Sequence, residues 1–388
     1  NGIAFNVGDG YTLTLKDLTL DHATVKNLGT VSATNVIFKN GVAVDDTSYG
    51  YDNAYGGAIY NYVSTDYYGY VTNVPKNTLY NCTFLNNSAM YGGAIYLPYG
   101  ELSLSNCKFI NNSAHWFGGA IASDKDSKIS VVGTVFENCR SVDDAGGAIY
   151  AQAVGGQIVI DNCSFISNSV SKNFAGGAIY ALQLIDGIKI TNSRFVNNSA
   201  NSPEDYGGGA ICFIGGNTER IGKLDISDSV FENNKDDVAG AIYIRGSTLD
   251  ISYSALVNNG DTAIYKGISN YVTARITADN NWWGTNDDPS VFVNGEIVSK
   301  WIVMTFTNDT PLTQGNKVLL TVALDTLNDG SKLDKTLVFA RPATIITPTE
   351  TFNNQYNVEY TIPEKVTVIL ATVDNPVSYT HLTLPTNR

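Results

Sequence analysis

A short motif, Gly-Gly-Ala-Ile followed in most copies by Tyr, recurs through most of this 388-residue chain. The copies begin at Gly56, Gly92, Gly118, Gly146 and Gly176, with looser versions at Gly208, Ala239 and Thr262. A second motif of the type Asn-x-x-Phe precedes the later copies, for example at Asn81, Asn106, Asn162 and Asn192. One repeat spans about 26 to 36 residues, which is typical of a solenoid.

The apolar residues inside each repeat alternate with a period of two, as in Leu224-Asp225-Ile226. This period indicates β-strands. Each repeat then forms one coil of three short strands: the GGAIY segment, a stretch such as 101–104, and the Phe-containing segment, with Asn and Gly at the bends. Long variable loops, such as 61–76 and 201–206, absorb the differences in length. The sequence therefore predicts an all-β fold built on a parallel β-helix.

Stacked coils place equivalent residues in columns, about 4.8 Å apart along the helix. A Phe column and an Ile column are predicted to form the core. The Phe column contains Phe38, Phe84, Phe109, Phe136, Phe165, Phe195, Phe231 and Leu256, and the Ile column contains Ile59, Ile95, Ile121, Ile149, Ile179, Ile211, Ile242 and Ile264. An Asn column is predicted to be hydrogen-bonded from side chain to side chain, and its members are Asn87, Asn112, Asn168, Asn198 and Asn234.

The five cysteines include no CxxC pair, which argues against a zinc site or a complete disulfide framework. Cys82, Cys107 and Cys163 share a column position that Thr134, Ser193 and Ser229 fill in other coils. We interpret this column as a place for small, semi-polar, inward residues. A bridge between neighbouring cysteines of the column is less favoured, since parallel, in-register Cβ directions suit disulfide geometry poorly.

The repeat stops after Gly295, and strand-like segments at the spacing of a sandwich follow. These segments are 301–306, 317–324, 336–340, 356–362 and 366–371. No cysteine lies in this region, so a sheet-on-sheet core must stabilise it.

The GGAI motif paired with FxxN resembles the repeats of chlamydial polymorphic outer-membrane proteins and, more closely, those of adhesin-like proteins of methanogenic archaea. The segment from Asp279 to Asn286, with Pro289 after it, looks like the NNWWG element that ends the β-helix of the archaeal family. This resemblance implies a right-handed parallel β-helix over 1–295, an immunoglobulin-like β-sandwich over 296–376 that serves as a stalk, and a location on the cell surface.

Residues 377–388 resemble one reading frame of a transposon-end adaptor used in shotgun sequencing. On this interpretation the chain is a metagenomic fragment, and the sandwich is truncated because its last strand has been replaced. A native final strand is the alternative, because the residues of this tail also alternate.

The formal net charge of −13 repels nucleic acid and anionic lipid. No apolar stretch approaches the length of a membrane span. The first residue is Asn1 rather than Met, so an absent export signal carries no information. We expect an extracellular protein whose partners are glycans or surface proteins of host or neighbouring cells, without nucleic acid and without a membrane span in this fragment.

Tyr60, Tyr62, Tyr67, Tyr68 and Tyr70 are the first candidate ligand-binding residues, since exposed Tyr among Gly and Asn is typical of binding loops. Tyr49 and Tyr51 lie close by in the sequence. A Tyr-rich flap packed along the helix is the alternative.

Trp282 and Trp283 are the second candidates. Their expected role is to cover the open end of the solenoid, and carbohydrate stacking is the alternative.

An enzyme is the main competing interpretation, because polysaccharide lyases and glycoside hydrolases also use β-helices. Their sites need clustered acids with a basic partner. Asp143-Asp144 and Asp236-Asp237, in the loops before GGAI or AGAI, are the acid pairs; we expect both to lack a local basic partner, and His22 and His115 are isolated. We therefore predict no catalysis and no cofactor, with weak Ca²⁺ binding at these acidic loops. A structural surface-layer component is the third interpretation.

Six Asn-x-Ser/Thr sequons occur, at Asn81, Asn86, Asn111, Asn162, Asn197 and Asn308. Asn81 and Asn162 adjoin inward columns. Glycan occupancy is therefore expected mainly at Asn308.

Overall fold

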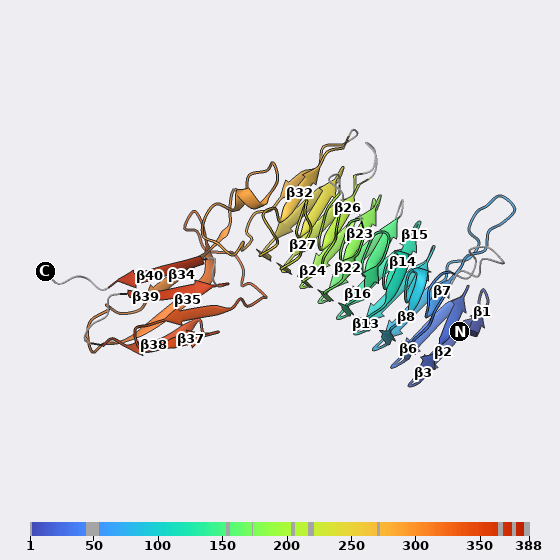
Figure 1. The fold of residues 1–388 in the computed structure, drawn as a ribbon, viewed down its shortest axis with the longest axis horizontal. Coiled ribbons are helices and arrows are strands. Elements are labelled where there is room, and N and C mark those ends of the chain that lie inside the picture. Colours follow the sequence, from blue (N-terminus) through green and yellow to red (C-terminus); the bar gives the residue numbers. More distant parts are fainter. Residues whose placement is uncertain are drawn as a thin grey trace.

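The chain folds into a long β-helix followed by a β-sandwich at its C-terminal end, as the computed structural model shows (Figure 1). The structure describes residues 2–43, 54–152, 156–172, 174–202, 206–215, 221–269, 272–363 and 368–374, together with the backbone of 378–383. Tyr49 and Tyr51 lie outside these residues.

Three long parallel sheets and one short parallel sheet form the wall of the β-helix. Sheet A contains β1 (Gly2–Val7), β4 (Ala23–Asn27), β7 (Ile59–Asn61), β11 (Ile95–Leu97), β15 (Ile121–Asp124), β19 (Ile149–Gln152), β23 (Ile179–Leu182), β26 (Ile211–Ile214), β29 (Ile242–Arg245) and β32 (Ile264–Gly267). Sheet B contains β2 (Thr12–Lys16), β5 (Thr30–Thr34), β8 (Lys76–Tyr80), β12 (Glu101–Ser105), β16 (Lys128–Val132), β20 (Gln157–Asp161), β24 (Ile188–Thr191), β27 (Lys223–Ser227), β30 (Thr248–Ser252) and β33 (Arg275–Thr277).

Sheet C contains β3 (Thr19–Asp21), β6 (Ile37–Lys39), β9 (Thr83–Leu85), β13 (Lys108–Ile110), β17 (Val135–Glu137), β21 (Ser164–Ile166), β25 (Arg194–Val196), β28 (Val230–Glu232) and β31 (Ala255–Val257). The short sheet D contains β10 (Ser88–Tyr91), β14 (Ser113–Phe117), β18 (Arg140–Ser141) and β22 (Ser169–Val170). Sheets A, B and C correspond to the three predicted strands of each coil. The sequence patterns did not predict sheet D.

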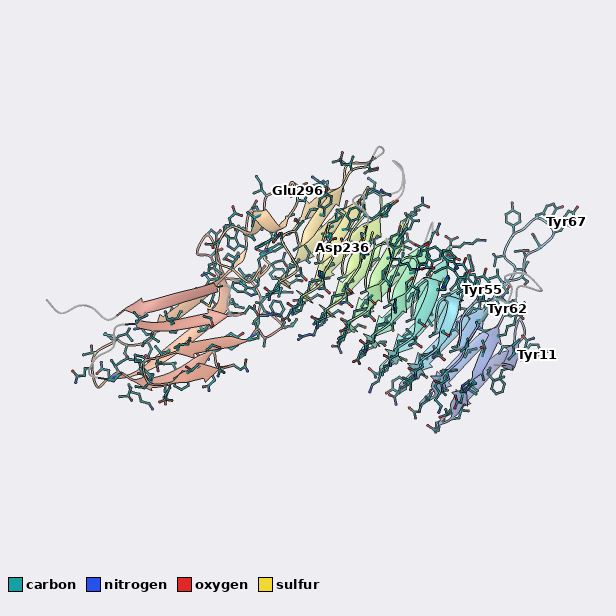
Figure 2. The ribbon with its side chains drawn as sticks, in the orientation of Figure 1. Tyr11, Tyr55, Tyr62, Tyr67, Asp236 and Glu296 are labelled. Atoms are coloured by element: carbon teal, nitrogen blue, oxygen red, sulfur yellow. The ribbon has the colours of Figure 1, made fainter. Side chains whose placement is uncertain are left out.

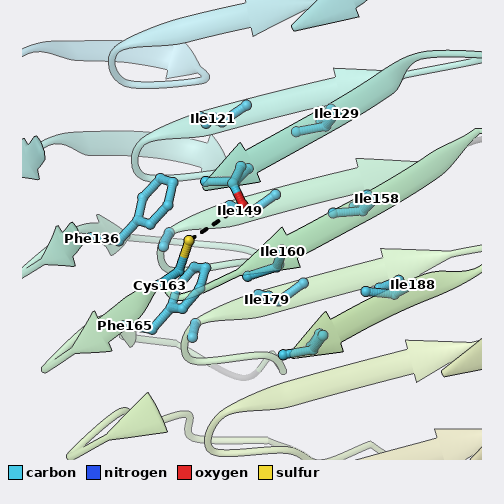
Figure 3. Packing of buried hydrophobic residues seen from close by; sticks show 14 of the residues in the cluster. Ile121, Ile129, Phe136, Ile149, Ile158, Ile160, Cys163, Phe165, Ile179 and Ile188 are labelled. Atoms are coloured by element: carbon cyan, nitrogen blue, oxygen red, sulfur yellow. Dashed lines mark hydrogen bonds between the residues drawn. The ribbon is translucent and has the colours of Figure 1, made fainter. Parts of the chain in front are cut away.

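The predicted columns form the core of the β-helix. Phe136, Phe165 and Phe195 pair in register and stack with ring centroids 4.7 Å apart, and all three are fully buried. The Ile column is also in register, for example Ile121 with Ile149, and Figure 3 shows both columns facing each other inside the coils. The period-two pattern therefore gave the correct inward face of sheets A and C.

Both glycines of each GGAI motif are required by the backbone. Gly146 has a φ of 72°, which lies in the left-handed region that glycine adopts without strain. A Cβ added to Gly147 would lie 2.0 Å from the carbonyl oxygen of Gly177 in the next coil. The motif thus combines a sharp turn with a close approach of neighbouring coils.

Polar side chains form hydrogen-bonded ladders inside the coils. The Asn168 Nδ2 donates to Asn198 Oδ1 at 3.0 Å, and Asn198 repeats this bond to Asn234 at 2.9 Å. The Asn ladder has one substitution, because Cys139 takes the position between Asn112 and Asn168 and its backbone N–H donates to Asn168 Oδ1 at 2.9 Å. These ladders satisfy backbone groups that the turns leave unpaired.

The small, semi-polar column is also present. The backbone N–H of Cys163 donates to Ser193 Oγ at 3.1 Å, and the Cys163 thiol donates to the carbonyl oxygens of Asp161 at 3.2 Å and Val131 at 3.5 Å. Figure 3 marks the bond between this thiol and the neighbouring coil. All five cysteines are buried and free.

The sandwich contains two antiparallel sheets. One holds β34 (Ile302–Asn308), β35 (Lys317–Leu327) and β38 (Asn357–Thr361); the other holds β37 (Thr351–Asn353), β36 (Ala343–Ile346), β39 (Val368–Val373) and β40 (Ser378–Thr383). A short 3-10 helix, η2 (Pro289–Phe292), lies before them.

One predicted strand of the sandwich is wrong. Residues 336–340 form no strand although they alternate, and the strand lies instead at β36. The reason is that 335–341 runs along the junction with the β-helix, where Lys335 and Arg341 make ion pairs with Asp228 and Glu232.

The tail was predicted to replace the last strand of the sandwich, and its residues do form β40, antiparallel to β39. Backbone pairing of this kind does not depend on which sequence supplies the strand. The adaptor origin of the tail therefore stays a prediction.

Candidate ligand-binding surface

A tyrosine-bearing hairpin projects from the edge of the β-helix where the chain passes from β7 in sheet A to β8 in sheet B. Its arms pair at Thr65 and Val71, and the Thr72 N–H donates to the carbonyl oxygen of Ser64 at 2.9 Å. At the tip, Asp66 Oδ1 accepts from the backbone N–H groups of Tyr68 and Tyr70, both at 2.9 Å. The Asp side chain therefore fixes the backbone of the tip.

The tip presents three tyrosines to solvent: Tyr67 is 97% exposed, Tyr68 80% and Tyr70 72%. The rings of Tyr67 and Tyr68 meet edge to face, with centroids 5.4 Å apart. Figure 2 shows Tyr67 on the projecting loop, with Tyr11, 74% exposed, at the same end of the molecule. Large exposed aromatic rings on a backbone fixed by hydrogen bonds are suited to binding without a large loss of conformational entropy.

Tyr60 and Tyr62 lie in a different environment, half-buried on the wall of the β-helix. Lys26 Nζ lies 5.4 Å from the Tyr60 ring centroid and 4.7 Å from that of Tyr62, and the two rings tilt against each other. The structure thus divides the candidate tyrosines: Tyr67, Tyr68 and Tyr70 project as a binding loop would, whereas Tyr60 and Tyr62 pack against the wall.

Tyr60 belongs to an aromatic row on the outer face of sheet A. The row arises because the residue after each Ile of GGAIY points outward, so that Tyr150 stacks on Tyr180 at 5.6 Å. Loop residues cover much of it, leaving Tyr150 5% and Tyr180 4% exposed. Cys212 occupies the same row between Tyr180 and Tyr243. This row is a second packed layer rather than an open binding strip.

Trp282 and Trp283 are both buried, at 0% and 3% exposure, so neither ring offers a face to a sugar. This corrects their interpretation as ligand-binding residues. Trp283 packs within the β-helix core and stacks on Phe292 at 6.3 Å. Trp282 packs with Ile302 and other residues of the sandwich core.

Trp282 also takes part in a buried polar network between the two domains. Its Nε1 donates to Asp374 Oδ2 at 2.6 Å. The Arg341 guanidinium makes ion pairs with Asp374 at 2.6 Å and with Glu232 of the β-helix at 3.0 Å, and the side chains of Arg341 and Asp374 are only 2% and 3% exposed. No local sequence pattern indicates this network, because its members lie far apart in the chain.

The acid pair Asp143-Asp144 has basic partners that local sequence reading missed. His115 Nε2 lies 3.0 Å from one Asp143 carboxylate oxygen and Lys172 Nζ 2.6 Å from the other. These partners come from the coils on either side, which corrects the prediction that the pair lacks a basic neighbour. The hydrogen bond from Lys172 holds the pKa of Asp143 below its usual value.

The pKa of Asp144 is shifted in the opposite direction, upward. Partial burial raises its pKa to about 6, and one of its carboxylate oxygens is enclosed without a hydrogen-bond donor. Burial also raises the pKa of Asp124, whose carboxylate accepts a hydrogen bond from the Tyr96 hydroxyl at 2.8 Å. Adjacent acids with separated pKa values are a feature of acid–base sites, although ion-pair networks produce them too.

In the second acid pair, Asp236-Asp237, both carboxylate oxygens of Asp236 accept hydrogen bonds from loop backbone. Asp236 Oδ1 accepts from the N–H groups of Val238 and Ala239, and Oδ2 accepts from Ser202 N. Within the described part of the chain, no group of three or more His, Cys, Asp or Glu residues is placed to hold a metal ion. Ca²⁺ binding at the acidic loops stays a prediction.

Coils of parallel strands around a single apolar core define a β-helix protein. In agreement, the family model of the right-handed β-helix region matches residues 2–195, half of the chain. The chain belongs to this family. No curated protein and no solved structure gives a significant match. No helix among the described residues has the length and apolar character needed to cross a membrane.

Proposed function

We propose that this protein is an adhesin-like, non-catalytic binding protein of the cell surface, and that the Tyr67–Tyr68–Tyr70 hairpin contacts its ligand. The observation that carries the proposal is the combination of near-complete exposure of the three rings with a tip that Asp66 holds by two hydrogen bonds. Each exposed ring forgoes burial, and exposed aromatic residues gathered on one loop are more typical of an interaction site than scattered ones.

The resemblance of the repeats and of the NNWWG segment to archaeal adhesin-like proteins supports this location and role. The proposed partners are glycans or surface proteins of neighbouring or host cells. The net charge of −13 disfavours strongly anionic partners. Tyrosine rings suit both partner classes, since they offer an apolar face and a hydroxyl.

The test is a binding screen of the full chain against a glycan array and against cell-surface extracts. A triple variant, Tyr67→Ser with Tyr68→Ser and Tyr70→Ser, should lose at least tenfold in affinity for any ligand found. The matched control is Tyr80→Ser, because Tyr80 is 51% exposed on sheet B and outside the hairpin. Equal affinity of the triple variant and the parent chain would remove the hairpin from the binding site.

A polysaccharide lyase or hydrolase is the second candidate function. The specific observation in its favour is the cluster of His115, Asp143 and Lys172 beside Asp144, an acid with a pKa raised to about 6. Against it, the ion pairs leave Asp143 little freedom to act as a base. We expect no cleavage of polygalacturonate or neutral polysaccharides; cleavage that Asp144→Asn abolishes would establish the enzyme instead.

A further inference from the structure

Five of the six sequons lie along the two borders of sheet C. Asn81 and Asn162 stand two residues before the first residue of β9 and of β21, and Asn86, Asn111 and Asn197 stand directly after β9, β13 and β25. All five are exposed at turns with positive φ, between 49° and 56°. Each sequon has the same form: an exposed Asn, a buried middle residue and a half-exposed Ser or Thr.

Asn308 differs from these five. It is half-buried, and its Nδ2 donates to the carbonyl oxygen of Thr310 at 2.7 Å. Asn81 Nδ2 also donates, to Asn35 Oδ1 at 2.8 Å, so the lower exposure of Asn308 is what sets it apart from the repeat sequons. The exposure of the five repeat Asn residues favours them as acceptors over Asn308, and the expectation that Asn308 is the main acceptor stays a prediction.

The turn conformation explains the Asn residues but not the whole sequon. Asn favours positive φ, so an Asn column is expected whether or not it is modified. For the sequons at Asn81 and Asn162, the residue two positions later starts a sheet C strand and has no such constraint. In successive coils this position holds Ile37, Thr83, Lys108, Val135, Ser164 and Arg194. The backbone therefore does not require the hydroxyls of Thr83 and Ser164.

Sheet C also presents the side chains that a glycan layer would cover. Leu85, Ile110, Ile166 and Val196 follow one another along its outer face, interrupted only by Glu137, and all are partly exposed. The sandwich covers the continuation of this face at Val257. The sequons stand on both sides of the uncovered part.

We propose that the borders of sheet C carry N-linked glycans at the repeat sequons, and that these glycans cover the aliphatic row while leaving the tyrosine hairpin free. The hairpin projects from the edge between sheets A and B, away from both borders.

In the reaction, the Asn Nδ2 forms a bond to C1 of a lipid-phosphate-linked oligosaccharide. The bond from C1 to the phosphate oxygen breaks, and one amide proton is lost.

Crowding limits the number of glycans on one border. Asn86 and Asn111 belong to neighbouring coils, since Leu85 pairs with Ile110. Neighbouring coils are about 4.8 Å apart, which is narrower than an oligosaccharide. One molecule should therefore carry a glycan at Asn86 or at Asn111, but not at both.

The experiment uses the full chain, secreted through a eukaryotic N-glycosylating pathway, with glycopeptide and intact-mass spectrometry. Occupancy at Asn81, Asn162 and Asn197 should exceed that at Asn308. Ser199→Ala should remove one glycan while keeping the turn at Asn197. Its matched control is Ser169→Ala, at the paired position of the preceding coil but outside any sequon, which should remove none.

A variant that combines Thr83→Ala, Ser164→Ala, Ser199→Ala and Thr310→Ala keeps only the two crowded sequons. It should carry one glycan per molecule at most, and two would overturn the crowding argument. Glycans mainly at Asn308, or repeat sequons left empty in the secreted chain, would overturn the proposal as a whole.

Discussion

At the scale of single residues, the column in which a side chain lies determines its contribution. The inner members of the Phe column, from Phe84 to Phe195, are fully buried and stack on two neighbouring rings, so each buries a large apolar area. Members of the small column contribute mainly hydrogen bonds to the turns. The column with Cys163 holds serine in later coils, where Ser193 Oγ donates to the carbonyl oxygen of Thr191 at 2.7 Å. A thiol and a hydroxyl are therefore nearly interchangeable at this position.

Truncation of Phe165 to Ala should cost about 3 to 5 kcal/mol of unfolding free energy, because it leaves a cavity between Phe136 and Phe195. Cys163→Ser should cost much less. Chemical denaturation gives both free energies, and hydrogen exchange should show that the Phe165 change loosens the adjoining coils first. Equal losses for the two variants would mean that Cys163 has a role which the column does not explain.

Asp144 should make the protein less stable as the pH rises from about 4 to about 6. Its pKa is 3.8 when unfolded and about 6 when folded, so the folded state holds the proton more tightly in this window. Above the folded pKa the full cost of the buried charge is present. Other acids, such as Asp143, have lowered pKa values and act in the opposite direction.

The measurement is therefore a comparison with Asp144→Asn, by thermal unfolding at a series of pH values. The variant should match the parent chain near pH 4 and exceed it in stability near pH 7. A constant difference across this range would show that Asp144 titrates normally in the folded protein.

At the scale of elements, regular structure was predictable and irregular structure was not. The period-two pattern and the repeats identified sheets A, B and C, because inward residues must be apolar in every coil. Sheet D was missed since strands as short as β18 and β22 carry no readable period. In the same way, the Tyr-rich composition indicated a loop, but only the contacts separate the projecting tip at Tyr67 from the packed Tyr60.

The hairpin that carries the tyrosines should depend on one side chain. Asp66→Ala removes the acceptor for the N–H groups of Tyr68 and Tyr70, so the tip should become more mobile while the β-helix keeps its stability. Hydrogen exchange at the tip should accelerate, and ligand affinity should fall because ordering the loop then costs entropy on binding. Asp9→Ala, at another exposed loop, is the control. Unchanged exchange at Tyr68 and Tyr70 would show that the tip is ordered by other contacts.

At the scale of the whole molecule, the two domains share a core and a polar network. Trp282 of the NNWWG segment belongs to the sandwich cluster, so this segment joins the domains as well as closing the β-helix. The sequence indicated a structural role for the Trp pair but gave no sign of Arg341, Asp374 or Glu232. Contacts between residues so distant in the chain follow from the docking of the two domains and not from local patterns.

The β-helix and the sandwich should unfold in a single transition as long as Arg341 is present at their junction. Arg341→Met leaves the buried Asp374 carboxylate without its cation, and loss of one partner of a buried ion pair costs about 3 to 5 kcal/mol. Calorimetry should then show the sandwich melting before the β-helix, in place of a single transition. Adding Asp374→Asn should recover part of the loss, because it removes the unpaired charge while its amide oxygen can still accept from Trp282 Nε1 and asparagine tolerates the φ of 57° at this position. Lys335→Met is the control at the rim: its side chain is 38% exposed, so its pair with Asp228 should contribute at most about 1 kcal/mol. Independent melting of the two domains in the parent chain would contradict the coupled junction.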